Sequence, residues 1–212
     1  MQLNGSVKRD PESPARLGSD QIEVRGEPVR PAGKIYLMLN KRRGLVTTAS
    51  DEKGRATIYS KLSSELPWVG PVGRLDKASE GLLLLTNDPE WAAAVTAPES
   101  HLAKIYHVQV SGLRSAALPE SLVRGFRVRD EGFLKVKAAS ILRKGERNTW
   151  LEIILEEGKN RHIRRMLEHL GIGVLRLVRV SIGPLALGDL AKGAFRPLTA
   201  EEKSAIERAL GA

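Results

Sequence analysis

The feature that most constrains the fold of this 212-residue chain is the run Gly81–Thr86, in which four consecutive leucines follow a glycine and precede a polar turn. A fully apolar run of this length, bounded by turn residues, indicates a strand that is buried on both faces. A bilayer span needs about 20 apolar residues, and no segment of the chain reaches that length. We therefore expect a globular protein that has no membrane as its partner.

Other regular patterns predict further strands. Lys34–Asn40 is a second short apolar run bounded by turn residues. Lys104–Val110 alternates, which places Tyr106, Val108 and Val110 on one face of a strand. More strands are expected at residues 126–129, 133–138, 149–156 and 174–182.

Capping signals predict helices among these strands. Asp88 is a helix cap followed by a proline, and Pro98 ends that helix. Thr199 and Glu202 form a capping box for a last helix that Gly211 closes. Strands and helices that follow no strict βαβ order predict a fold of the α+β class.

The positive charge of the chain is concentrated in its second half. The chain has 34 Lys+Arg against 25 Asp+Glu, a formal charge of +9. Residues 1–30 are neutral, with five basic against five acidic side chains, whereas residues 121–150 hold eight against three and residues 158–180 six against one. An excess of this kind favours a polyanionic partner, nucleic acid above all, since Lys and Arg that neutralise phosphates release counterions.

Prolines and glycines interrupt every apolar period near the amino terminus. Residues 1–32 are therefore expected to be a disordered leader. One domain should follow over residues 33–202, and residues 203–212 should form the end of the C-terminal helix.

Several chemistries are excluded by composition or spacing. The absence of cysteine excludes disulfides, thiolate zinc sites and cysteine nucleophiles, and permits a reducing cytoplasm. His162 and His169 lie about 10 Å apart along a predicted helix, too far for one metal, so no metal site is expected. Lys77–Gly81 lacks the first glycine of a serine nucleophile elbow, and Gly70–Gly73 lacks the end of a phosphate-binding loop.

One segment with functional character is GRLDKASEGLLLLTND, residues 73–88. It is a charged loop, bracketed by glycines, that leads directly into the leucine strand. A loop anchored by a buried strand can hold a side chain such as Asp76 in a fixed position. A surface turn with salt-bridged charges is the alternative, and composition alone favours it.

A second such segment is EEGKNRHIRRM, residues 156–166. Asn160 can cap a helix whose apolar stripe is Ile163, Met166, Leu167 and Leu170. On a helical wheel Arg164 lies at the flank of this stripe and can reach into a cleft, while Arg161 and Arg165 point away. The alternative is a solvated basic face.

These two motifs, with the strand KIYHVQV between them, resemble in order and spacing the nucleophile, tyrosine and arginine motifs of RsuA-type pseudouridine synthases. That family isomerises single uridines in ribosomal RNA. The resemblance extends from about Gly33 to about Glu202. It implies a mainly antiparallel mixed sheet with flanking helices and a central cleft. A small amino-terminal lobe is expected at about residues 34–75 and a main lobe at about residues 76–202.

The resemblance also assigns roles to individual residues. It implies that Asp76 is the catalytic aspartate, Tyr106 the aromatic residue that packs on the target base, and Arg164 the arginine that pairs with the aspartate. Arg74 is expected to touch the RNA backbone or to fill the vacated stack. The expected phosphate contacts are Lys104, Lys159, Arg161 and Arg165.

The implied reaction moves the glycosidic bond of uridine from N1 to C5, and it requires no cofactor. A nucleophilic carboxylate can attack either the sugar or the base, and the sequence leaves both open. The nucleotide must be flipped out of the RNA for this step.

Many family members carry an RNA-binding domain of about 60 residues before the catalytic one, and the leader is too short to hold it. The chain therefore resembles the short members that act on large-subunit (23S) RNA. The expected partner is ribosomal RNA or a partly assembled subunit, with the protein a cytoplasmic monomer that needs no obligate protein partner. The alternatives are the same reaction on 16S RNA, a non-catalytic RNA-binding or ribosome-assembly protein on this fold, and a basic protein with a small-molecule substrate.

Overall fold

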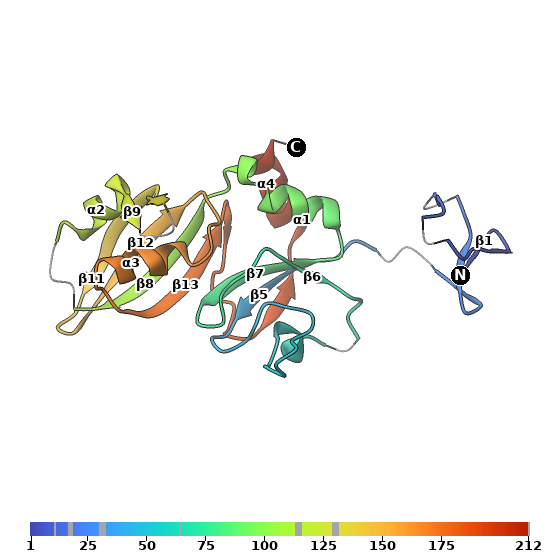
Figure 1. The fold of residues 1–212 in the computed structure, drawn as a ribbon, viewed down its shortest axis with the longest axis horizontal. Coiled ribbons are helices and arrows are strands. Elements are labelled where there is room, and N and C mark those ends of the chain that lie inside the picture. Colours follow the sequence, from blue (N-terminus) through green and yellow to red (C-terminus); the bar gives the residue numbers. More distant parts are fainter. Residues whose placement is uncertain are drawn as a thin grey trace. The chain divides into compact units, whose positions relative to one another are not determined.

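The computed structural model describes residues 1–10, 12–16, 19–29, 33–63, 65–112, 116–128 and 132–211. The chain forms two compact units, Met1–Lys34 and Ile35–Ala212 (Figure 1).

The first unit is a small antiparallel sheet with the strand order β2-β1-β3-β4. Its strands are β1 (Gln2–Leu3), β2 (Ser6–Val7), β3 (Ile22–Val24) and β4 (Glu27–Pro28). Two-residue turns join β1 to β2 and β3 to β4, and all four turn residues have positive φ: 51° and 78° at Asn4 and Gly5, 55° and 82° at Arg25 and Gly26. Such turns match the twist of paired strands and require residues that tolerate positive φ.

This sheet differs from the disordered leader expected over residues 1–32. The physical reason lies in Gly5 and Gly26, which interrupt the apolar pattern because they occupy hairpin turns, not because they end all structure. The strands have only two or three residues each, too few for an alternating pattern to be visible in the sequence.

The second unit is built on a nine-stranded sheet with the order β11-β12-β8-β13-β7-β5-β15, while β14 pairs with β13 and β6 with β7. Every described pair is antiparallel except β13 with β7, so the expected mixed and mainly antiparallel sheet is confirmed. The strands are β5 (Tyr36–Lys41), β6 (Gly70–Val72), β7 (Glu80–Thr86), β8 (Lys104–Ser111), β11 (Ala138–Lys144), β12 (Asn148–Leu155), β13 (Val174–Ile182), β14 (Leu185–Ala186) and β15 (Phe195–Pro197).

A separate two-stranded sheet is formed by β9 (Phe126–Val128) and β10 (Gly132–Leu134). The single strand expected at residues 133–138 is therefore wrong: β10 ends at Leu134, and β11 begins at Ala138 in the large sheet. The chain leaves one sheet and enters the other within these residues. Residue 129, the last of the expected strand 126–129, lies outside the described residues.

The helices are α1 (Pro89–Thr96), α2 (Leu118–Arg124), α3 (His162–His169) and α4 (Ala200–Leu210), with 3₁₀ turns at Ile58–Lys61 and Pro98–Ser100. Asp88 caps α1 by accepting a hydrogen bond from the Trp91 N–H. Thr199 and Glu202 form the predicted capping box of α4, which ends at Gly211 in the left-handed conformation. Residues 118–124 form a helix that the sequence pattern did not predict.

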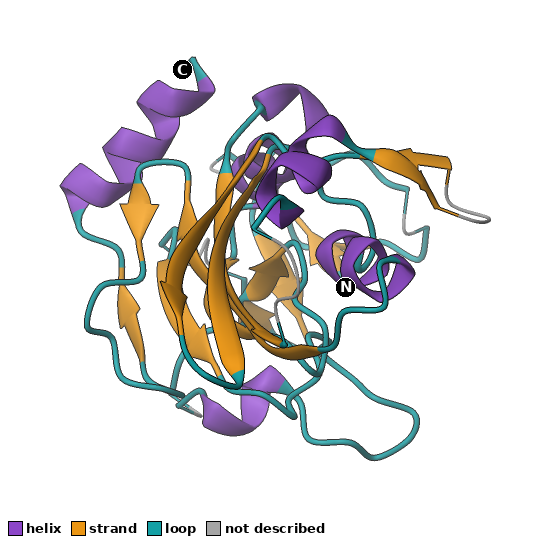
Figure 2. Ribbon diagram, turned by 90° about the vertical axis from the view of Figure 1, so that its left-hand side faces the viewer, coloured by secondary structure: helices purple, strands orange, loops and turns teal. Residues whose placement is uncertain are grey.

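Helices lie around the twisted strands of the large sheet (Figure 2). Three hydrophobic clusters form the core between these elements. Strands β8 and β12 pack against α2 and α3 in the first cluster, whereas α1 and α4 cover β7 in the second. Leu82 and Leu84 belong to the second cluster and Leu83 and Leu85 to the third, and all four side chains are 0% exposed. The leucine run is thus a strand buried on both faces, as predicted.

The parallel pairing of β7 with β13 joins the two halves of the large sheet. Gly81 lies opposite Arg179 in this pair and has a φ of 103°. A Cβ atom on Gly81 would lie 2.2 Å from the carbonyl oxygen of Arg179. Only glycine permits this approach, which fixes the start of β7 and the loop before it.

Candidate active site

Asp76 lies in the loop of residues 73–79, called here the Asp76 loop, and is half-buried. Its own carbonyl oxygen accepts a hydrogen bond from the Ser79 N–H at 2.9 Å. The hydroxyl of Thr47 donates to the carbonyl oxygen of Leu75 at 2.8 Å, and the Gly44 N–H donates to that of Lys77 at 2.7 Å. The backbone on both sides of Asp76 is therefore held by other segments.

Lys41, at the end of β5, binds the backbone of the same loop. Its side chain is 0% exposed, and its Nζ donates to the carbonyl oxygens of Asp76 at 3.0 Å, Ser79 at 2.9 Å and Arg42 at 3.3 Å. Burial lowers the pKa of Lys41 to about 8, although the charges of Asp76 and Glu80 act to raise it. Lys41 was not predicted as a functional residue; the only sign of it in the sequence is a lysine at the end of an apolar strand.

Arg164 reaches the Asp76 loop from α3, where the helical wheel placed it at the flank of the apolar stripe. Its side chain is 8% exposed, and its Nη2 donates to the carbonyl oxygen of Ala78 at 3.0 Å. Burial lowers the pKa of Arg164, Arg161 lowers it further, and the charge of Asp76 acts to raise it. Within the described residues no ion pair of 4.0 Å or less joins Arg164 to Asp76. Arg164 is connected to Asp76 by its hydrogen bond to the loop at Ala78 and by the attraction between the two charges.

The predicted capping of this helix by Asn160 is wrong. The cap position of α3 is Arg161, in the left-handed conformation with a φ of 51° and with no side-chain cap. Asn160 instead accepts a hydrogen bond from Nη2 of Arg165 at 3.2 Å. Ile163, Met166 and Leu167 are buried as predicted, while Leu170 is exposed because it follows the last turn of the helix.

Tyr106 stands between the segments that carry Asp76 and Arg164. On β8 it lies opposite Arg179 of β13, which in turn lies opposite Gly81 at the start of β7. Its half-buried side chain packs against the cluster that contains Ile163 of α3 and also against the cluster that contains Leu75. The fold therefore brings the tyrosine strand, the Asp76 loop and α3 together.

The residues expected to contact RNA differ in their surroundings. Arg74 is exposed and lies in the Asp76 loop. Lys159 pairs with Glu157 at 2.7 Å and Arg161 with Glu168 at 3.1 Å, so two of the expected phosphate contacts already have carboxylate partners. Arg165 is half-buried at the start of α3. Lys104 is half-buried at the start of β8, where burial lowers its pKa.

Glu80 follows the Asp76 loop directly and was not singled out from the sequence. It is 6% exposed and accepts hydrogen bonds from Nε and Nη2 of Arg176, both at 3.1 Å, and pairs with Lys192 at 3.0 Å. Burial alone would raise the pKa of Glu80, but the bonds from Arg176 and Lys192 hold it below its ordinary value. This ion cluster ties β7, β13 and the segment before β15 together.

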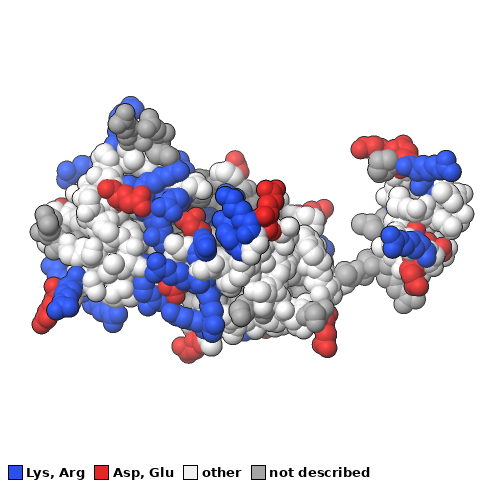
Figure 3. All heavy atoms as spheres, turned by 60° about the horizontal axis from the view of Figure 1, so that its bottom comes forward, with Lys and Arg blue, Asp and Glu red and all other residues white. Residues whose placement is uncertain are grey.

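On the face shown in Figure 3, Lys and Arg side chains of the unit Ile35–Ala212 cover more of the surface than the Asp and Glu side chains that lie among them. Among the described residues no three His, Asp or Glu side chains are grouped to hold a metal ion. In the same part of the chain no helix is both long and apolar enough to cross a bilayer.

Comparison with known proteins identifies the family. Residues 35–169 match the family model of RNA pseudouridylate synthase. Ribosomal large subunit pseudouridine synthase B of Bacillus subtilis (strain 168) is 37% identical over 186 residues, which cover 87% of this chain and 76% of that protein. A protein of Aquifex aeolicus (strain VF5), named as an uncharacterized RNA pseudouridine synthase, is 36% identical over 212 residues, or 100% of this chain and 85% of that protein.

A solved structure confirms the fold. The crystal structure of a pseudouridylate synthase matches with a TM-score of 0.72 and 29% identity, covering 97% of this chain and 87% of the other. The chain therefore belongs to the RNA pseudouridylate synthase family and is a pseudouridine synthase that acts on RNA.

Proposed function

We propose that this pseudouridine synthase isomerises a uridine of large-subunit (23S) ribosomal RNA and that Asp76 is its nucleophile. The observation that carries the proposal is the Asp76 loop itself, whose backbone accepts hydrogen bonds from Lys41, Thr47 and, at Ala78, the buried Arg164. A carboxylate in a fixed loop beside a buried cation is suited to nucleophilic attack. The ribosomal substrate is supported by the name of the Bacillus subtilis relative.

In this reaction the bond from C1′ of the ribose to N1 of uracil breaks, and a bond from C1′ to C5 forms. The carboxylate of Asp76 adds to C1′ or to the base, the base turns, and the carboxylate leaves as the new bond is completed. N1 gains a proton and C5 releases one, so atoms and charge balance. The positive charge of Arg164 stabilises the carboxylate when the bound base displaces water from around it.

Tyr106 provides a surface on which the flipped base can stack. Its ring lies between the two clusters that the Asp76 loop and α3 contribute to. Enzymes that modify a base inside structured RNA take it out of the stack and hold it against aromatic or apolar side chains. Arg74, exposed within the loop, can contact the RNA that the uridine leaves.

The test is release of tritium from ribosomal RNA labelled at C5 of uridine. The native chain should release tritium from 23S RNA, whereas Asp76→Asn should release none while still binding the RNA. Asp189→Asn removes an exposed carboxylate elsewhere and should behave as the native chain does. Release by Asp76→Asn would refute the assignment of the nucleophile, and release from 16S RNA alone would refute the choice of subunit.

A further inference from the structure

The face of the sheet opposite α3 carries a row of polar side chains around Trp150. Arg143 of β11 lies opposite Trp150 of β12, Trp150 lies opposite Gln109 of β8, and Gln109 lies opposite Arg176 of β13. Directly opposed residues share a face, so these four side chains form one line across four strands. Their chain neighbours Leu151 and Val108 point into the core beneath α3.

The indole of Trp150 is flanked by two guanidinium groups. Cζ of Arg143 lies 5.4 Å from the ring centroid and Cζ of Arg176 lies 5.5 Å from it. The two arginines come from β11 and β13, so side chains from two other strands fix the position of the ring. A half-buried indole fixed in this way is a rigid aromatic surface.

A pocket of about 260 Å³ opens beside this ring, at the turn that joins β11 to β12. Its walls include Trp150, Gln109 and Asn148. The turn is well defined, because the Gly145 N–H donates to the Asn148 carbonyl at 2.8 Å and the Gly112 N–H donates to the Arg147 carbonyl at 3.1 Å. The volume is below the about 300–1,000 Å³ of sites that enclose a whole drug-sized ligand, so the pocket suits the base of one nucleotide whose sugar and phosphate stay outside it.

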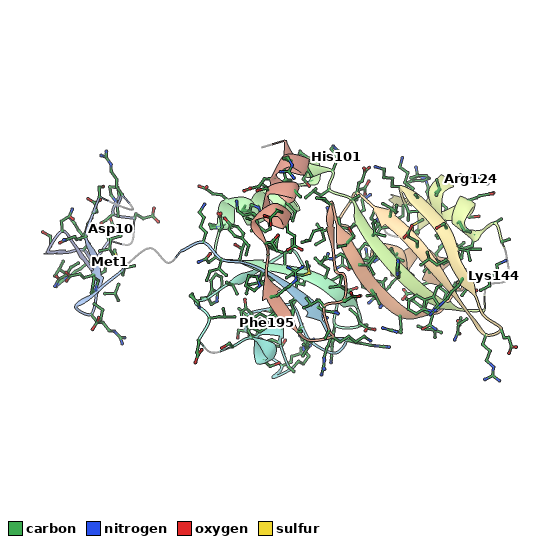
Figure 4. The ribbon with its side chains drawn as sticks, turned by 180° about the vertical axis from the view of Figure 1, so that it is seen from behind. Met1, Asp10, His101, Arg124, Lys144 and Phe195 are labelled. Carbon is green, nitrogen blue, oxygen red and sulfur yellow. The ribbon has the colours of Figure 1, made fainter. Side chains whose placement is uncertain are left out.

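The charge at this pocket favours an anionic occupant. Arg143, Lys144 and Arg147 line it, with Glu146 as the single acidic residue of the wall. None of these three cations forms an ion pair with a residue that the structure describes, in contrast to Lys159 and Arg161. Figure 4 shows Lys144 at the end of β11, near the turn to β12, with side chains that stand out from the sheet.

We propose that this pocket binds a nucleotide of the substrate RNA other than the target uridine, with its base against Trp150 and its phosphates on the turn cations. The inference rests on the proposed function only in taking ribosomal RNA as the RNA that is bound. Stacking on an aromatic ring within a basic groove is how proteins bind single-stranded RNA without reading its sequence. The row and the proposed active site lie on opposite faces of the same sheet, so an RNA that occupies both passes around the end of the sheet where Arg176 binds Glu80 beside the Asp76 loop.

The experiment measures binding of a labelled twelve-nucleotide oligoadenylate to the full-length chain at several salt concentrations. This probe contains no uridine, so the result does not depend on catalysis. Trp150→Leu should weaken binding about tenfold, since stacking of one base contributes roughly that much. The pair Arg143→Gln and Arg147→Gln should weaken binding and lower the salt slope by about 1.4, because each phosphate that is no longer neutralised lowers it by about 0.7.

A matched control removes the same charge from two elements that do not line the pocket. Arg124→Gln with Arg127→Gln changes two exposed arginines on α2 and β9, and should alter binding less than about twofold. Equal losses of affinity in both pairs, or no loss in the first pair, would overturn the proposal. If Trp150→Leu does not fold, the pair Arg143→Gln with Arg147→Gln and the variant Trp150→Phe provide the test instead.

The same variants separate this pocket from the proposed nucleophile. On ribosomal RNA the Trp150 and arginine variants should raise KM about tenfold and leave kcat unchanged, because the pocket does not touch the reacting atoms. A native chain that binds oligoadenylate through Trp150 but makes no pseudouridine in 23S RNA would refute the proposed function and leave the pocket supported.

Discussion

Lys41 illustrates how a buried side chain can determine the geometry of a loop that is distant in sequence. Its ammonium group donates to two carbonyl oxygens of the Asp76 loop, at Asp76 and Ser79, which lie 35 and 38 positions later in the chain. A buried carbonyl left without a donor costs about 1–3 kcal/mol. Lys41 therefore acts on the proposed nucleophile through the backbone and is a positioning residue.

We expect Lys41→Met to lower kcat about 10- to 100-fold, because a shift of about 1 Å in a reacting group has effects of that size. RNA affinity should change less than about threefold, since the side chain is buried and cannot touch the substrate. Lys53→Met, at an exposed position outside the loop, is the control and should keep the native kcat. Loss of RNA binding in Lys41→Met with normal kcat would contradict the positioning role.

The lowered pKa of Lys41 makes a separate prediction for stability. The pKa is about 8 in the folded chain against 10.5 for the free side chain. Between these values the unfolded chain binds the extra proton, so the Lys41 contribution to the free energy of unfolding rises with pH. From pH 8 to pH 9 the native chain should gain about 1 kcal/mol relative to Lys41→Met in urea unfolding. A constant or falling difference would show that Lys41 is not desolvated.

Sequence reasoning located residues whose role follows from local geometry and missed those whose role follows from burial. The place of Arg164 follows from helix periodicity, and the structure puts it at the Asp76 loop. Lys41 and Glu80 are charged, and charged residues beside an apolar run ordinarily face water. Their burial depends on carbonyl groups and cations from other segments, such as Arg176 and Lys192 for Glu80, and local sequence does not reveal these partners.

At the scale of elements, the parallel contact of β7 with β13 determines how the site is assembled. This pair places the Asp76 loop beside the strand that neighbours Tyr106. The two strands are separated by more than 80 residues, so their pairing is a long-range event that no local pattern encodes. The strands themselves were predicted, and so were the ends of α1 and α4, because apolar runs and caps are local signals.

Gly81→Ala should destabilise the protein by about 3 kcal/mol or more. The new Cβ would lie 2.2 Å from the Arg179 carbonyl oxygen, and the φ of 103° is unfavourable for alanine. Gly44→Ala is the control, because Gly44 has a φ of 95° with no atom within 4 Å of its Cβ position. Gly44→Ala should cost about 1–2 kcal/mol in urea unfolding. Equal costs for the two variants would show that the strand contact is not tight.

At the scale of the whole molecule, charge and structure are divided between the two units in different ways. Residues 1–30 carry five basic and five acidic side chains, so the net charge of +9 belongs to the rest of the chain. The exposed cations at the Asp76 loop, at the cap of α3 and at the β11–β12 turn all lie in the unit Ile35–Ala212. Electrostatic attraction of RNA is therefore a property of the second unit.

Removal of residues 1–33 tests this division. The remaining chain should unfold at the same urea concentration as the second unit of the native chain, because its three hydrophobic clusters contain no residue before Ile35. The salt slope of RNA binding should change by less than about 0.7, the value for one phosphate contact, since the removed segment has no net charge. A larger fall in the slope would show that Lys8, Arg9 or other basic side chains of the small sheet contact phosphates despite the neutral total. An unchanged slope with a lower affinity would instead indicate that the small sheet contributes uncharged contacts to RNA.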